Sequence, residues 1–329
     1  MPTEKDRNQE YFKETILTAK TLLASHPEWV NRFKVYADKI LANTQNIRQK
    51  KTQFHEWAPL YLYLNVGTAR GASKSVNFSL RYHGQAVADL TVSDSVKIST
   101  AEYKNKRDFN CETTCDCGWR EKDANAFRKY FATNPARQRT KDNKGNEEHR
   151  IESMFLTELS KKKGSIKNQE LHGIQPVKIG GLARFQMATP LSASKSGLVY
   201  STYGKGGGVD ILARVGNGAN TRICIMEVKD EYTQQEPPKE ALAQGLAYAT
   251  FVRELLRSPG GKTWWKIFGF SRGIPEHLTI YVASVMPFNP NGPSEEILYD
   301  DLPIGDDKFT LHHVYFSEEG IIKSVKTSF

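Results

Sequence analysis

The sequence is poor in cysteine and lacks long apolar runs, and each shortage argues against a class of protein. Four cysteines in 329 residues are too few for a disulfide-stabilised scaffold. No apolar run approaches the roughly 18 residues that a membrane-spanning helix needs. The charged start, MPTEKDRNQE, does not resemble a signal peptide. We therefore expect a soluble, cytoplasmic protein with no membrane partner.

Internal repeats and low-complexity tracts are also lacking, which argues against a repeat architecture. The chain is long enough for two domains with separate cores. Residues 133–147, TNPARQRTKDNKGNE, are polar, contain proline and glycine, and show no apolar period, as in a linker. We place the boundary there and predict domains at 1–134 and 135–329.

Positive charge is concentrated in the first half of the chain. Residues 1–150 hold 26 Lys and Arg against 18 Asp and Glu, a net charge of +8, whereas residues 151–329 hold 20 against 19. Lys and Arg that neutralise phosphates supply the sequence-independent part of nucleic-acid affinity. The excess indicates either a polyanionic partner for the first half or only good solubility.

Apolar spacing predicts the secondary structure. The first half reads as α+β: helical over 9–52, strands over 59–67 and 75–99 with a turn at His83 and Gly84, and a helix over 123–132. In the second half we expect helices at 148–162 and 238–257, strands at 183–188, 209–215, 222–229 and 278–285, and a hairpin at 312–328. One helix, three strands, a helix and a strand predict an α/β fold with helices packed on a mixed sheet.

The cysteines are clustered, with three of them in CETTCDC. Cys111, Cys115 and Cys117 could hold a structural zinc ion only with a distant fourth ligand such as His83. An ordinary strand and turn is the favoured interpretation. Cys224 lies in an apolar strand and is expected to be a small core residue.

Three charges interrupt two apolar strands that should be buried. Asp210 begins the strand of GGGVDILARV, and Glu227 and Lys229 end that of CIMEVKDE, with the short turn GNGANT between the strands. Residues two apart in a strand share a face, so Lys229 should lie beside Glu227 while Val228 points into the core. If the strands are neighbours, Asp210 and Glu227 can bind one divalent metal ion, with the Val228 carbonyl as a further ligand.

These motifs resemble the PD-(D/E)xK nuclease superfamily over roughly residues 148–290, with Val209 in place of the proline of the family name. The resemblance implies a restriction-endonuclease-like core, with Asp210 and Glu227 as ligands of Mg²⁺, for which Mn²⁺ should substitute. It also implies Lys229 as the catalytic lysine. The alternative is that the acids and the lysine form ordinary ion pairs at a strand edge and a turn.

Two flanking helices carry further candidates. In EEHRIESMFLTEL, Glu152 lies on the apolar stripe with Phe155 and is the stronger candidate for a metal ligand, while Glu148 is the weaker one; a solvated acid near a helix start is the alternative. In ALAQGLAYA, Gln244 and Tyr248 are four apart on one face. They resemble the Gln-x-x-x-Tyr element of RecB-like members, which implies that both side chains lie near the phosphate.

The residues and the resemblance together predict a metal-dependent DNA endonuclease, of restriction or defence type, with a basic N-terminal domain for target recognition. RNA or branched repair intermediates are alternative substrates, and a non-catalytic nucleic-acid-binding protein on a nuclease fold is an alternative of another class. Duplex DNA is the expected partner, and a homodimer is compatible with it.

We predict that the cysteine cluster is dispensable for cleavage, because an oxygen-ligated magnesium ion and not a thiolate-bound zinc ion should act in hydrolysis. A folded Cys115→Ser variant should keep the parent's magnesium-dependent rate in a plasmid cleavage assay. Stoichiometric zinc in the parent that is lost with the substitution would reveal a structural zinc site instead.

Overall fold

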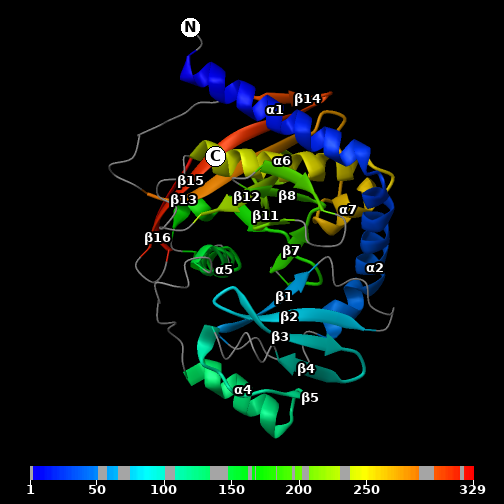
Figure 1. Cartoon of the computed structure of the whole chain (residues 1–329), viewed down its shortest axis with the longest axis vertical. Coiled ribbons are helices and arrows are strands. Elements are labelled where there is room, and N and C mark those ends of the chain that lie inside the picture. The colour runs from blue at the N-terminus through cyan, green and yellow to red at the C-terminus, as the bar shows by residue number, and fades with distance from the viewer. Residues whose placement is uncertain are drawn as a thin grey trace.

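The fold was analysed in a computed structural model of the chain (Figure 1). The structure describes residues 3–50, 58–65, 75–100, 108–133, 147–161, 165–166, 168–182, 184–194, 197–201, 207–229, 238–288, 300–318 and 322–329. It is a mixed α/β architecture in which helices pack on mixed sheets. Most of the predicted linker, residues 134–146, lies outside the described residues.

Two long helices begin the chain, where the sequence predicted one helical stretch. They are α1 (Glu4–Ser25) and α2 (Glu28–Lys50). The start of α1 is capped by Thr3, whose hydroxyl accepts a hydrogen bond from the Asp6 backbone at 3.1 Å. Pro27 lies between the helices, and its ring prevents a continuous helical backbone there.

The first sheet has the strand order β10-β7-β1-β2-β3-β4-β5. Its strands are β1 (Leu60–Asn65), β2 (Val76–Tyr82), β3 (Gln85–Val92), β4 (Val96–Thr100), β5 (Asp116–Gly118), β7 (Phe185–Ala188) and β10 (Gly208–Val209). The predicted turn at His83 and Gly84 joins β2 to β3, and both residues have positive φ. Helix α4 (Lys122–Thr133) packs against β1 and β5.

The second sheet has the order β14-β15-β13-β12-β11-β6, with β16 paired to β15. Its strands are β6 (Ile174–Pro176), β11 (Ile211–Val215), β12 (Arg222–Val228), β13 (Thr279–Pro287), β14 (Leu302–Ile304), β15 (Asp307–Glu318) and β16 (Ile322–Thr327). Strands β12, β13 and β15 run parallel, while β11 is antiparallel to β12. The predicted closing hairpin is confirmed as β15 and β16.

Helices cover both faces of this second sheet. Helix α5 (Glu147–Leu159) packs in the core that contains Cys224 and Met226, whereas α6 (Pro238–Arg257) packs in the core that contains Ile223 and Ile225. This alternation follows the two-residue period of β12. The remaining elements are α7 (Gly261–Ile267), the hairpin of β8 (Leu191–Ser194) and β9 (Gly197–Tyr200), and the 3-10 turns Gln169–Leu171 and Gly218–Asn220.

One predicted strand belongs to a different sheet from the one expected. The strand expected at 183–188 is present as β7, but it pairs with β1 and β10 in the first sheet. The place beside β11 is taken by β6, which the sequence analysis did not predict. Strand β6 has only three residues, too few for a two-residue alternation to be recognised.

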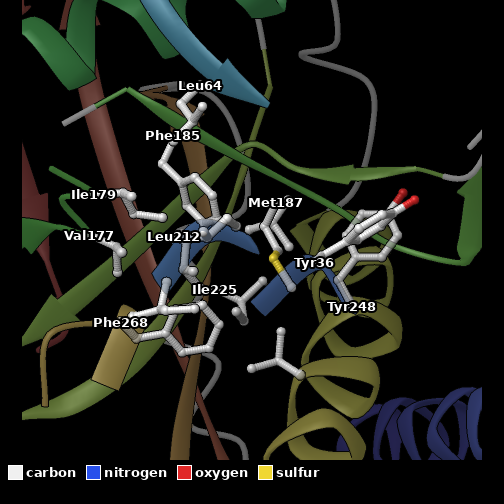
Figure 2. Packing of buried hydrophobic residues seen from close by; sticks show 14 of the residues in the cluster. Tyr36, Leu64, Val177, Ile179, Phe185, Met187, Leu212, Ile225, Tyr248 and Phe268 are labelled. Carbon is white, nitrogen blue, oxygen red and sulfur yellow. The ribbon is translucent and has the colours of Figure 1, made fainter. Parts of the chain in front are cut away.

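The largest core joins the two predicted domains. Phe33 of α2 lies with its ring centroid 4.8 Å from that of Phe251 in α6, and it accepts a hydrogen bond from the Trp264 indole through its backbone carbonyl. Figure 2 shows side chains of both halves in this core, including Tyr36, Leu64, Phe185, Leu212 and Tyr248. A domain boundary between residues 134 and 135 stays a prediction. The largest core contains residues from both sides of it, and β1 pairs with β7 across it.

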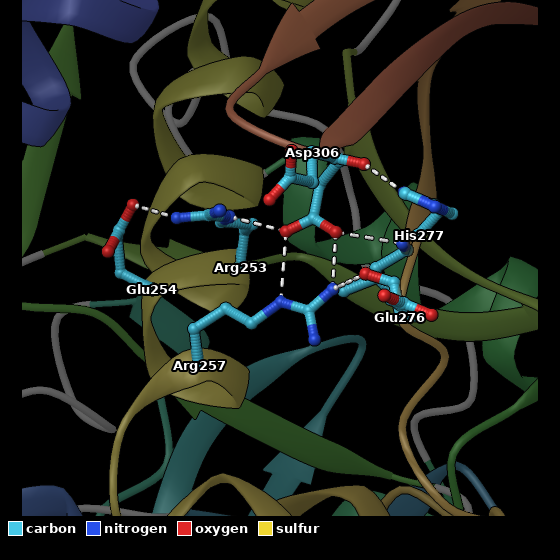
Figure 3. A network of polar contacts seen from close by, with 8 residues as sticks. Arg253, Glu254, Arg257, Glu276, His277 and Asp306 are labelled. Carbon is cyan, nitrogen blue, oxygen red and sulfur yellow. Dashed lines mark hydrogen bonds and ion pairs between the residues drawn. The ribbon is translucent and has the colours of Figure 1, made fainter.

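A network of polar contacts joins the start of β15 to Arg253 and Arg257 at the end of α6 (Figure 3). The side chain of Asp307 is fully buried and accepts hydrogen bonds from Arg253 Nε at 2.7 Å, Arg257 Nε at 3.0 Å and the Leu278 backbone at 2.8 Å. Burial alone would raise the pKa of Asp307, yet the hydrogen bonds from Arg257, Leu278 and Arg253 outweigh it and lower the pKa below 3.8.

We predict that Asp307→Asn destabilises the fold by about 3 kcal/mol at neutral pH, because it leaves two arginines without their shared charge partner. A carboxyl with a lowered folded-state pKa stabilises the fold above its unfolded pKa and loses this effect as the pH falls through the folded value. The difference from the parent should therefore shrink below about pH 4. Urea unfolding at several pH values measures both effects.

The exposed neighbour Asp306 supplies the matched control. Asp306→Asn should change the free energy of unfolding by less than about 0.5 kcal/mol at every pH. Equal unfolding midpoints for the two variants would contradict the role given to Asp307.

Candidate active site

The three charges predicted to meet do come together at the carboxyl end of β12. Asp210 lies between β10 and β11, and the pairing of Ile211 with Met226 places it beside Glu227. Asp210 Oδ2 accepts a hydrogen bond from the Val228 backbone at 2.8 Å. Glu227 is only 2% exposed, so this carboxylate is removed from water.

Val228 separates the two charged residues of the strand. Its side chain is fully buried in the core on the α5 face, as the two-residue period predicts. Its backbone N–H points to Asp210, and in an extended strand the carbonyl of the same residue points to the same side. The Val228 carbonyl therefore remains a candidate ligand.

Lys229 lies at the centre of the site and contacts three of the other candidate side chains. Its Nζ lies 3.4 Å from Glu227 Oε1, 3.4 Å from Glu148 Oε1 and 3.0 Å from Gln244 Oε1. The side chain is 6% exposed, so these oxygens replace most of the water around the ammonium. The contacts bring together β12, the first turn of α5 and the face of α6 that covers the sheet.

The two acids of α5 occupy different surroundings. Glu148, the weaker candidate, contacts Lys229 and keeps 39% of its side chain exposed. Glu152, the stronger candidate, is 2% exposed, and its Oε2 lies 3.4 Å from His149 Nδ1. The hydrogen bond with Glu152 is the main cause that raises the pKa of His149. Glu152 thus faces a histidine, and its negative charge also acts on Asp210.

The two α6 candidates differ in the same way. Gln244 contacts Lys229 directly, whereas the Tyr248 hydroxyl accepts a hydrogen bond from the Ala193 backbone at 3.4 Å. A Cβ on Gly207 would lie 2.1 Å from that hydroxyl, so glycine is required for the approach. Burial, followed by the negative charge of Glu227, raises the pKa of Tyr248 to about 12. Tyr248 therefore anchors the β8 hairpin and the segment before Asp210.

Carboxylates outnumber the ammonium group within this contact network. Burial, followed by repulsion from Glu152, raises the pKa of Asp210 from 3.8 to about 7. Burial, followed by repulsion from Asp210, raises the pKa of Glu227 well above its ordinary value. Glu227 Oε2 is buried without a hydrogen-bond partner among the described residues. A bound cation would offset the repulsion and satisfy this oxygen.

The donor set fits magnesium or manganese. In the described part of the chain no three His, Cys, Asp or Glu side chains gather at metal-ligand spacing. Mg²⁺ usually takes one or two carboxylates and completes its shell with water and substrate phosphate. Asp210 and Glu227 would supply that pair, with the Val228 carbonyl as a further oxygen, while Glu152 contacts His149.

The cysteine cluster is away from these acids, on and before β5. Cys111 and Cys115 are buried, Cys117 is partly exposed, and all are free thiols. Burial, followed by the neighbouring Cys117, raises the pKa of Cys115 to about 12. Cys224 is fully buried in the sheet core, as expected.

Three polar residues near the site were missed by the sequence analysis. His149 contacts Glu152, while Arg81 of β2 and Gln186 of β7 contact each other at 2.5 Å. The available signal was a charge at an inward position of the strand in SLRYHG, two residues before the turn. The pairing of β7 with β1 brings this charge toward the site, and the sequence order gives no indication of that pairing.

Comparisons of the chain with family models, with curated proteins and with solved structures found no match. Within the described residues, every helix is too short or too polar to traverse a bilayer.

We predict that Asp210→Asn stabilises the metal-free protein at pH 8. A carboxyl whose folded-state pKa is raised stabilises the fold only below its unfolded pKa, and this contribution is lost as the pH rises through about 7. Asparagine does not ionise and avoids that loss. We expect a gain of about 1 kcal/mol, or roughly 2–4 °C in melting temperature, because the partly exposed carboxyl is screened by solvent.

The measurement is thermal unfolding between pH 4 and 8, with chelator and then with magnesium. The gain should vanish toward pH 4, and magnesium should raise the melting temperature of the parent more than that of the variant. Asp116→Asn, which alters an exposed carboxylate of β5, is the matched control and should follow the parent. A metal-free Asp210→Asn protein that melts below the parent at pH 8 would contradict the raised pKa of Asp210.

Proposed function

We propose that the protein is a metal-dependent nuclease that hydrolyses phosphodiester bonds of DNA. The observation that carries this proposal is the meeting of Asp210, Glu227 and Lys229 at the end of one strand, with a buried carboxylate oxygen left unpartnered among the described residues. The large majority of buried polar atoms are hydrogen-bonded, so an unpartnered carboxylate oxygen beside an ammonium group favours a cation site.

Each side chain then has a chemical role. Asp210 and Glu227, with the Val228 carbonyl, would hold magnesium, which supplies charge neutralisation and lowers the pKa of a bound water. The Lys229 ammonium orients the attacking water and stabilises charge on the phosphate. The Gln244 amide oxygen holds that ammonium at 3.0 Å, so its direction is fixed before substrate arrives.

The order of elements supports a restriction-endonuclease-like core. Helix α5, strands β6, β11 and β12, helix α6 and strand β13 follow one another in the order helix, three strands, helix, strand. Strands β7 to β10 are inserted between β6 and β11. Of these, β7 and β10 extend the first sheet, while β8 and β9 form the small hairpin. Asp210 directly precedes β11, Glu227 lies in β12, and Lys229 directly follows β12.

The net charge of +8 in residues 1–150 supports a nucleic-acid substrate, and duplex DNA is the form we propose. RNA and branched intermediates share the phosphodiester chemistry and enter the test as further substrates. A non-catalytic DNA-binding protein would retain binding without cleavage. A homodimer would place two such sites on the two strands of a duplex.

The experiment compares Asp210→Ala with Lys229→Ala. Asp210→Ala removes a ligand, so metal affinity and turnover should both fall. Lys229→Ala removes a charge that repels the ion but assists water and phosphate, so metal affinity should be kept or raised while cleavage falls by about 100-fold or more. Calorimetric metal titration and single-turnover cleavage of plasmid, single-stranded DNA and RNA measure the two effects.

Lys308→Ala is the matched control. Lys308 lies on β15 and also pairs with a carboxylate, that of Asp301. It should cleave at the parent rate. Cleavage by Lys229→Ala at the parent rate on every substrate would falsify the role of the lysine, and a parent that binds DNA but cuts none of these substrates would support the non-catalytic alternative.

A further inference from the structure

Arg81 is a charged residue in an otherwise buried strand of the first sheet. It is 7% exposed, and its guanidinium carbon lies 4.3 Å from the ring centroid of Tyr63 in the neighbouring strand β1. Its Nη2 donates to Gln186 Oε1 at 2.5 Å, and its Nη1 lies 3.4 Å from the Gly84 carbonyl oxygen. A guanidinium removed from solvent is not available to a phosphate backbone, so nucleic-acid binding does not explain it.

The first of these contacts leads to Asp210. Gln186 belongs to β7, which pairs with β10 so that Val209 faces Met187. A Cβ on Gly208 would lie 3.8 Å from the Gln186 side chain, an ordinary packing distance. Arg81 therefore fixes a side chain that packs on the strand ending one residue before Asp210.

The second contact leads to α5. Gly84 has a φ of +79°, and a Cβ there would lie 2.0 Å from the carbonyl oxygen of His149. The turn between β2 and β3 thus packs directly against the first turn of α5. This helix carries Glu148 and Glu152. Arg81 holds this turn from the strand before it.

We infer that Arg81 is a positioning residue through which the first sheet fixes the two elements that carry the site's acids. An effect of Arg81 on cleavage rests on the proposed function. Its effect on cation binding follows from the contacts around the site. Side chains that orient ligands without touching the metal commonly change its affinity about 10-fold to 100-fold when removed.

A purely electrostatic role for Arg81 predicts the opposite sign. A nearby positive charge repels a divalent cation, so Arg81→Met would tighten cation binding if charge were the only effect. Loss of positioning weakens binding instead. Arg81→Lys separates the two further, because it keeps the charge but cannot make the forked contacts of a guanidinium.

The test is calorimetric titration of the full-length chain with Mn²⁺ alone. We expect Arg81→Met, Arg81→Lys and Gln186→Ala each to weaken binding by about 10-fold. The double variant Arg81→Met with Gln186→Ala should lose less affinity than the sum of the two single losses, because both substitutions remove the contact between Arg81 and Gln186. If Arg81→Met does not fold, the two milder variants decide the outcome.

Arg128 offers a matched control in α4. It is 3% exposed, and its guanidinium carbon lies 4.0 Å from the ring centroid of Trp119, so burial and stacking resemble those of Arg81. Arg128→Met should lower the melting temperature and leave Mn²⁺ affinity unchanged. Equal losses of Mn²⁺ affinity in Arg128→Met and Arg81→Met would assign the effect to general destabilisation and overturn the inference.

Mn²⁺ binding by Arg81→Met at parent affinity or tighter would also overturn the inference. Its failure is distinguishable from failure of the proposed function. A parent that binds Mn²⁺ but cleaves no substrate removes the nuclease proposal, while the titrations still decide on Arg81. A parent that cleaves, with Arg81→Met unchanged in affinity and rate, removes only the role of Arg81, and a parent that binds no Mn²⁺ removes both.

Discussion

Burial of carboxylates near the end of β12, followed by their mutual repulsion, is the constraint on which the site depends. Glu227 and Glu152 are each 2% exposed, and Asp210 lies beside Glu227 on the adjacent strand. Removing ionised groups from water costs several kcal/mol each unless partners compensate. Lys229 compensates in part, and the raised pKa of Asp210 and Glu227 shows that it does not suffice. The fold therefore sustains a local instability that a cation would relieve.

The surrounding architecture holds these charges in place. Helices α5 and α6 lie on opposite faces of the second sheet, so the buried Glu227 cannot turn into solvent without disrupting a core. Asp210 stands where the chain passes from β10 in the first sheet to β11 in the second. Both sheets consequently contribute to its position, and the basic first half of the chain becomes part of the site's framework.

Local periodicity explains why so much of the site was predictable. Glu227 and Lys229 share a strand face at a spacing of two residues, and a short turn brings Asp210 alongside, so neither contact required knowledge of distant elements. Local periodicity does not distinguish which acid of α5 contacts Lys229, because Glu148 and Glu152 lie one turn apart on the same face. The packing of α5 in the tertiary structure gives the lysine contact to Glu148.

The sequence by itself determined the α/β elements and the strand and helix faces that carry Asp210, Glu227, Lys229 and Gln244, because helix and strand periods act over a few residues. Only the tertiary structure decided that β7 joins β1 in the first sheet, that β6 takes its expected place, and that Arg81 reaches Gln186. Arg81 and Gln186 are 105 positions apart in the sequence. Pairings across such separations depend on how whole sheets and helices bury one another, and no local pattern encodes them.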